Sequence, residues 1–193
     1  MTELFKKNPI IAACETKALS AAVASDVGSV IYMKAEINTV VSNTFKSLCR
    51  MKPVFLHADL LKGLSGDKEA LRFIKKHIEP YGIVSTKSNI IKAAKREGLA
   101  TIQRVFLIDT QSFHNSLDAI TENEPDGIEI MPAIAPSIVK KYKEHFSIPI
   151  ILGGLISDSS QIEAAFDQGA DAVSFSKSDL WSYKPGAGSK NPV

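Results

Sequence analysis

The sequence predicts a compact, single-domain (β/α)8 barrel of the TIM type. Over 193 residues, short apolar runs alternate with amphipathic or Ala-rich segments, at about 24 residues a unit. This alternation indicates a parallel sheet whose strands are joined by crossover helices, and eight units are enough to close a barrel. The alternative is an open doubly wound sheet. Its dinucleotide-binding form would carry G-x-G-x-x-G after the first strand, and the sequence has no such motif there.

The first half of the chain supplies four strand–helix units. Its apolar runs predict strands at 10–14, 30–33, 53–56 and 82–84. The segments between them predict an Ala-rich helix at 17–25 and amphipathic helices at 39–50, 67–77 and 90–97. Asp67 is a candidate N-cap for the third helix, and Gly98 ends the fourth.

The second half repeats the pattern. It predicts strands at 100–103, 127–130, 148–152 and 172–175, and helices at 110–121, from 136 and at 158–169. Pro136 opens the sixth helix, because the first turn of a helix does not need its missing N–H. Asp158 and Gln161 have the spacing of a capping box, and Gly169 provides a helix stop.

The loops after the last two strands predict a phosphate site. The run 148–152 ends in Gly153-Gly154, and the run 172–175 ends in Ser176-Lys177. In eight-unit barrels these two loops often bind phosphate, since glycine lets backbone N–H groups approach an oxyanion. A Gly-Gly pair also occurs in ordinary tight turns, and the motif alone does not separate the two.

Composition and length favour one domain at residues 1–184, followed by a flexible Gly/Pro-rich tail at 185–193. The sequence has neither an apolar run of the ~20 residues that a membrane helix needs nor the apolar region of a signal peptide. Cys14 and Cys49 have no metal-ligand or redox-motif spacing, which indicates reduced thiols in a cytoplasmic protein. We therefore expect no membrane partner.

Charge is distributed unevenly although the net charge is only +2. Residues 41–100 hold 12 Lys/Arg against 5 Asp/Glu, a net of +7, and residues 101–139 hold 1 against 6, a net of −5. Such an asymmetry is typical either of a surface that meets a polyanion or of Lys-rich, solvated helix faces.

In a barrel, the polar residues at the carboxyl ends of the strands would meet at one mouth. Four basic groups could balance a dianionic phosphate: Lys34, Lys87, Arg104 and Lys177. Three carboxylates could accept hydrogen bonds from hydroxyl groups: Glu15, Asp59 and Glu129. With His57, Gly153, Gly154 and Ser176 they form a predicted site for a small phosphorylated polyol. His57 and Asp59 alone are too few ligands for a metal ion, so we expect neither a metal nor a cofactor.

Six segments, in this order, resemble one protein family. They are VFLHADLLKGL, YGIVSTKSNIIKAAK, TIQRVFLIDT, PDGIEIMP, PIILGGLISD and GADAVSFSKSDLW. Together they look like the glycerol-3-phosphate-responsive antiterminators, the regulatory proteins of glycerol uptake operons. The resemblance covers nearly the whole chain. It implies a bacterial cytoplasmic barrel that senses glycerol 3-phosphate and binds the leader mRNA of glycerol-catabolic genes, so that transcription passes a terminator.

Two positions depart from the family pattern. Ser157-Asp158 stand where a basic residue is expected, and Phe175 stands where a small hydroxyl residue is expected. Lys177 is a candidate to supply, in the phosphate site, the positive charge that the missing basic residue would have provided.

If RNA is the partner, the basic segment supplies its contacts, because phosphates provide most of the non-specific affinity for RNA. Neighbouring helices of a barrel can join their charges into one patch. The predicted RNA-binding residues are Arg72, Lys75, Lys76, Lys92, Lys95 and Arg96.

Two other functions stay open. A barrel with lysines and a phosphate site could be an aldolase, an isomerase or a phosphodiesterase, since a barrel fold does not determine function. No nucleophile or base paired with an orienting group is evident, so we predict no catalytic residues. A ligand-binding protein without RNA is the third hypothesis. The oligomeric state is not indicated, and an oligomer is possible.

Overall fold

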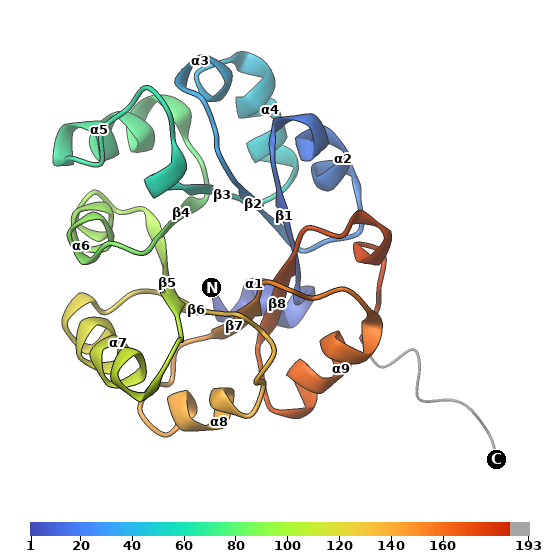
Figure 1. Cartoon of the computed structure of the whole chain (residues 1–193). Helices are drawn as coiled ribbons and strands as arrows, with labels where there is room; N and C mark the ends of the chain where they lie inside the picture. Colours follow the sequence, from blue (N-terminus) through green and yellow to red (C-terminus); the bar gives the residue numbers. More distant parts are fainter. Residues whose placement is uncertain (186–193) are drawn as a thin grey trace.

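The computed structural model describes residues 1–185 and confirms a closed, parallel eight-stranded barrel inside a ring of helices (Figure 1). Each strand pairs with the next in sequence, and β8 closes the barrel against β1. The strands are β1 (Ile10–Cys14), β2 (Ser29–Tyr32), β3 (Val54–His57), β4 (Gly82–Ser85), β5 (Ala100–Phe106), β6 (Gly127–Met131), β7 (Ile150–Gly153) and β8 (Ala172–Phe175). The predicted tail lies, except for residue 185, outside the described residues.

The outer ring contains α2 (Leu19–Ala24), α3 (Ile37–Val40), α4 (Asn43–Met51), α5 (Lys68–Phe73), α6 (Ser88–Arg96), α7 (Thr110–Asn123), α8 (Ile138–Lys143) and α9 (Ser159–Asp167). Short 3-10 turns follow three of the strands: η1 (Thr16–Ala18), η2 (Ala58–Leu60) and η4 (Ser178–Leu180). A π-helical turn, η3 (Ile74–Ile78), continues α5. None of the helices in residues 1–185 combines the length and apolar character needed to cross a membrane.

Local signals in the sequence placed several helix ends correctly. Asp158 and Gln161 form the predicted capping box of α9, and Asp67 accepts the N–H of Ala70 to cap α5. Gly98 and Gly169 follow their helices with φ angles of +72° and +90°, a conformation in which glycine carries no steric penalty.

Four predicted helices differ from the structure. The helix expected at 17–25 begins with the 3-10 turn η1, and α2 starts only at Leu19. The segment expected as one helix at 39–50 is split into α3 and α4, because Ser42 accepts the N–H of Phe45 at 3.1 Å and starts a new helix. The helix expected at 67–77 changes to π-helical geometry at Ile74. The sixth helix begins at Ile138, after Ser137, and not at Pro136.

The barrel interior is a separate apolar core, distinct from the larger core between strands and helices. Seven strands contribute one fully buried side chain each: Ile11, Ile31, Phe55, Val84, Ile102, Ile151 and Ala172. Phe5, which is 2% exposed, joins this cluster from α1 (Thr2–Lys7), a helix that the sequence did not predict. Figure 1 shows α1 and the N-terminus near the centre of the ring. We conclude that α1 covers the amino end of the barrel.

Replacing Phe5 with Ala should therefore lower the free energy of unfolding by about 3–5 kcal/mol, the usual range for removing a buried aromatic ring. Urea denaturation followed by circular dichroism would measure the change. Lys7→Ala, an exposed position on the same helix, is the matched control and should shift the free energy by no more than about 0.5 kcal/mol. Equal effects of both substitutions would contradict the covering role of α1.

Candidate ligand site at the barrel mouth

A cavity of about 690 Å³ opens at the carboxyl end of the barrel, between the loops after β7, β8, β1 and β2. Four predicted site residues line it: Glu15, Lys34, Gly154 and Ser176. The sequence did not predict several other wall residues, among them Ala13, Met33, Leu155, Ser174 and Trp181. A smaller, mainly apolar cavity of about 320 Å³ lies between the loops after β5 and β6 and helices α7 and α8.

The floor of the mouth is the next layer of inward-pointing side chains above the apolar interior. Because side chains alternate along a strand, the residue two positions after an interior residue points inward again. This layer carries the small residues Ala13, Gly153 and Ser174 on one side and the larger Met33, His57, Thr86 and Arg104 on the other. Glu129 joins it through its bonds to Arg104 and Ser174. The cavity opens over the small residues.

A buried ion pair links β5, β6 and β8 in this layer. Arg104 Nε donates to Glu129 Oε2 at 2.6 Å, and Ser174 Oγ donates to Glu129 Oε1 at 2.5 Å. The Arg104 and Glu129 side chains are 3% and 0% exposed. Neither of these two predicted ligand residues lines the cavity.

The ion pair and its Ser174 donor require glycine at position 153. A Cβ atom at this position would lie 2.3 Å from Ser174 Oγ and 3.0 Å from Glu129 Oε1. Only glycine therefore leaves room for the hydrogen bond between Ser174 and Glu129.

His57 is 4% exposed and does not line the cavity. Its Nδ1 atom has no hydrogen-bond partner among residues 1–185. Burial, and then the positive charge of Arg104, lowers the pKa of His57 below its ordinary value of 6.5. The imidazole is therefore neutral at physiological pH.

Asp59 lies in η2 and is held by the loop after β4. It accepts hydrogen bonds from Ser85 Oγ at 2.6 Å, from the Thr86 N–H at 2.7 Å and from Thr86 Oγ1 at 2.9 Å. Burial alone would raise the pKa of Asp59, but these donors outweigh that effect and the pKa lies below 3.8. Asp59 thus ties two mouth loops together and does not reach the cavity.

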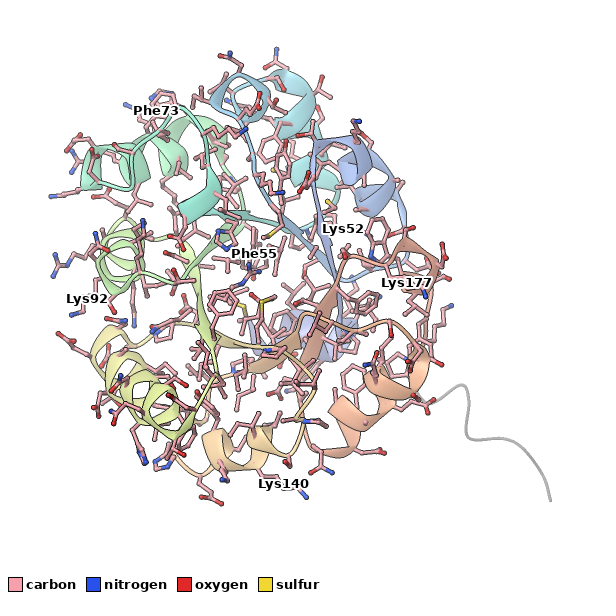
Figure 2. All side chains as sticks on the ribbon, viewed as in Figure 1. Lys52, Phe55, Phe73, Lys92, Lys140 and Lys177 are labelled. Carbon is pink, nitrogen blue, oxygen red and sulfur yellow. The ribbon has the colours of Figure 1, made fainter. Side chains whose placement is uncertain are left out.

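The three predicted lysines occupy different surroundings. Lys34, with a φ of +48°, pairs with Glu15 at 2.6 Å, and both side chains are about 60% exposed at the cavity edge. Lys177, labelled in Figure 2, donates to the Ser157 carbonyl at 2.8 Å and so joins the loops after β7 and β8. Lys87 is exposed, precedes α6 and does not line the cavity.

Backbone groups in the last two loops are available to an anion. The N–H of Gly154 is already used, since it donates to the Ser174 carbonyl at 3.3 Å. The N–H groups of Ser176 and Lys177 have no acceptor among residues 1–185. Gly154 and Leu155 both have positive φ angles, +75° and +59°. For leucine this conformation costs about 1–2 kcal/mol, and its side chain is 70% exposed beside the cavity.

The predicted RNA-binding residues lie on α5, η3 and α6; Figure 1 shows α5 and α6 across the ring from β1 and β8, whose loops border the cavity. Most of their charges have partners. Arg72 pairs with Glu69 and Glu97, Lys92 pairs with Glu122 at 2.5 Å, Lys95 pairs with Glu124, and Lys75 donates to the Gly98 carbonyl. Lys76 and Arg96 are exposed and form no ion pair with residues 1–185.

No group of three or more His, Cys, Asp or Glu side chains suited to a metal ion occurs within residues 1–185. Cys14, at the cavity wall, is buried, and this burial raises the pKa of its thiol to about 12. The thiol is therefore protonated at neutral pH.

Comparison with known proteins gives consistent matches over nearly the whole chain. The family model of the glycerol-3-phosphate responsive antiterminator matches residues 10–181. The uncharacterized protein YgcP of Escherichia coli K12 is 34% identical over 183 residues, 94% of this chain and 95% of that protein. The structure of the glycerol uptake operon antiterminator regulatory protein from Listeria monocytogenes is 34% identical, with a TM-score of 0.84 over 91% of this chain and 95% of that one. The structure of a glycerol uptake operon antiterminator-related protein from Thermotoga maritima is 26% identical, with a TM-score of 0.78 over 90% of this chain and 98% of that one.

Replacing Asp59 with Asn should remove a pH-dependent part of the stability. The folded-state pKa of Asp59 lies below 3.8, so its ionised form stabilises the fold above that pH, and the contribution is lost as the pH falls through the lowered pKa. Melting temperatures from pH 7 to pH 2.5 should show a deficit of the variant at neutral pH that shrinks in acid. A deficit that is constant over the whole range would contradict this role.

Proposed function

Because this chain belongs to the glycerol-3-phosphate responsive antiterminator family, we propose that its mouth cavity binds glycerol 3-phosphate as an effector. We also propose that it binds the leader mRNA of glycerol-catabolic genes in the cytoplasm and allows transcription to pass a terminator. The observation that carries the ligand part is the cavity itself. Its volume of about 690 Å³ exceeds that of a small phosphorylated polyol, and donors for an oxyanion lie at one end.

The phosphate end of the ligand fits the loops after β7 and β8. The free N–H groups of Ser176 and Lys177 can donate to phosphate oxygens. The Lys177 ammonium, now bound to the Ser157 carbonyl, would add a positive charge if it turned to the ligand. Lys34 can add a second positive charge, because its exposed pair with Glu15 is worth only about 0–1 kcal/mol and exchanges easily for a stronger partner.

The hydrogen bonds that the protein already makes to the Glu129 and Asp59 carboxylates fit a regulatory role better than a catalytic one. Glu129 is held by Arg104 and Ser174, and Asp59 is held by Ser85 and Thr86. A general base must face its substrate within hydrogen-bond reach, whereas these oxygens already accept bonds from the protein. We therefore propose that the ligand is bound and not converted.

RNA binding would use α5, η3 and α6. Lys76 and Arg96 are the charges most available to phosphates, and the exposed ion pairs around Arg72 and Lys95 can open at small cost. Ligand binding would order the loops after β2, β3 and β4, and the last two of these lead into α5 and α6. By linkage, RNA would tighten ligand binding by the same factor as the ligand tightens RNA binding.

Glycerol 3-phosphate should raise the melting temperature, whereas glycerol at equal concentration should not. A ligand at 100 times its Kd stabilises the native state by about 2.7 kcal/mol, which differential scanning fluorimetry detects. Gly154→Val should abolish the shift, because the added side chain occupies the cavity wall. Gly169→Val is the matched control: its φ of +90° imposes comparable strain, with open space around the Cβ, at the end of α9. It should lower the melting temperature but keep the shift. Equal shifts from both compounds would contradict a phosphate site.

Leader mRNA should bind more tightly when glycerol 3-phosphate is present, and the double variant Lys76→Gln/Arg96→Gln should weaken that binding. Each lost phosphate contact reduces the slope of log K against log salt by about 0.7 for single-stranded RNA, so the slope should fall by up to ~1.4. Lys140→Gln/Lys141→Gln on α8 removes the same charge elsewhere (Figure 2 labels Lys140) and should leave the slope unchanged. An affinity that does not respond to glycerol 3-phosphate would refute the regulatory proposal. Equal losses in both double variants would place RNA outside α5 and α6.

A further inference from the structure

Arg104 has donors that the protein does not use well. Its Nε is bound to Glu129, but Nη1 and Nη2 each have only the Met33 sulfur, at 3.8 Å, as a partner among residues 1–185. A thioether is a weak acceptor, and buried donors without good partners are unfavourable. The Arg104 side chain is 3% exposed, so the N–H groups on Nη1 and Nη2 are buried with only a weak acceptor.

Met33 contacts this fork through its sulfur and also lines the mouth cavity. It follows β2, is partly buried and lines the cavity, as does Ser174 on the other side of the Arg104–Glu129 pair. Methionine has three rotatable side-chain bonds and adapts readily to a changed neighbour. A rotation of Met33 would expose the guanidinium to whatever occupies the cavity.

The charge of Glu129 beside Arg104 favours a neutral ligand group over an anionic one at Nη1 and Nη2. Glu129 lies 2.6 Å away and already neutralises the guanidinium. A phosphate or carboxylate at Nη1 and Nη2 would be close to the Glu129 carboxylate in a poorly solvated interior, where like charges repel strongly. A hydroxyl oxygen adds no charge and can accept from an N–H. The planar fork presents two donors side by side, which matches two neighbouring oxygens.

His57 provides a second, independent indication. It belongs to the same inward-pointing layer and is 4% exposed, and its Nδ1 atom has no partner among residues 1–185. A neutral imidazole can donate to a hydroxyl or accept from one. The layer beneath the cavity therefore holds unused hydrogen-bonding groups on both His57 and Arg104.

We infer that Arg104, uncovered by displacement of Met33, recognises the vicinal hydroxyl groups of the ligand, with His57 as an additional partner. The inference rests on the proposed function, since it assumes that the cavity holds a phosphorylated ligand. It moves Arg104 from phosphate neutralisation, the role expected from the sequence, to selection of a polyol. The effector class is then a phosphate ester that carries a neighbouring diol, and a phosphate ester without hydroxyl groups binds poorly.

Titration calorimetry on the full chain with glycerol 3-phosphate and with n-propyl phosphate tests this directly. The two compounds share charge and chain length and differ in the diol. The unaltered protein should prefer glycerol 3-phosphate by roughly tenfold or more, because groups built to bond a hydroxyl reject an analogue that lacks it. Arg104→Gln combined with Glu129→Gln removes both buried charges together, which avoids an unpaired charge. The preference should fall to about threefold or less, with the Kd for propyl phosphate unchanged.

Met33→Ala tests the covering role without touching the ion pair. It should strengthen binding of glycerol 3-phosphate several-fold relative to propyl phosphate, since no side chain must be displaced. Met131→Ala is the matched control, because Met131 also lines the cavity but, among residues 1–185, is not a hydrogen-bond partner of Arg104. It should leave the ratio unchanged.

The outcomes separate the two proposals. If the unaltered protein binds neither compound, the proposed function and this inference both fail. If it binds both equally, or if the Arg104→Gln/Glu129→Gln variant keeps the preference, the phosphate site stands and the role of Arg104 is overturned. An unchanged ratio in Met33→Ala likewise overturns it, and this variant gives a result even if the double variant does not fold.

Discussion

The ion pair between Arg104 and Glu129 decides how the upper half of the barrel is built. Removing one partner of such a buried pair typically costs about 3–5 kcal/mol, because the other charge is left without compensation. The pair also requires Ser174 on β8 as a donor and excludes any side chain at position 153. The positions of polar groups on four strands, β5 to β8, therefore depend on one another, and Ser174, a member of this group, also lines the cavity.

The interior is apolar below this pair and polar at its level. Phe5 and the seven interior side chains exclude water from the lower half, so the polar layer has access to solvent only through the mouth. The small residues Ala13 and Gly153 leave space on one side of that layer, whereas His57 and Arg104 fill the other. This asymmetry explains why a cavity forms beside β7, β8, β1 and β2 and not over the barrel axis.

Asp59 connects the mouth with the surface proposed for RNA. It holds Thr86, which stands next to Lys87 at the start of α6, and the far end of α6 carries Lys95 and Arg96. A ligand that shifted the loops after β3 and β4 would act on this contact, which provides a physical element for coupling between the two sites. The basic patch is weaker than the sequence suggests, because carboxylates from neighbouring helices neutralise much of it.

The sequence by itself determined the alternation of strands and helices, most strand positions to within one or two residues, and the capping of α5 and α9, because periodicity and capping are local properties.

Tertiary structure decided which polar residues contact one another. Arg104 and Glu129 are 25 residues apart and become partners because they are opposite one another in the β5–β6 register. Periodicity identified the strands but not the register that sets these residues together. Likewise, the sequence predicted Gly153 and Lys177 in one phosphate site, and only the packing shows that a side chain at position 153 would meet Ser174 and that the N–H groups of Ser176 and Lys177 lack acceptors among residues 1–185. Barrel closure brings loops together that are far apart in the sequence, and a local sequence pattern carries no information about such contacts.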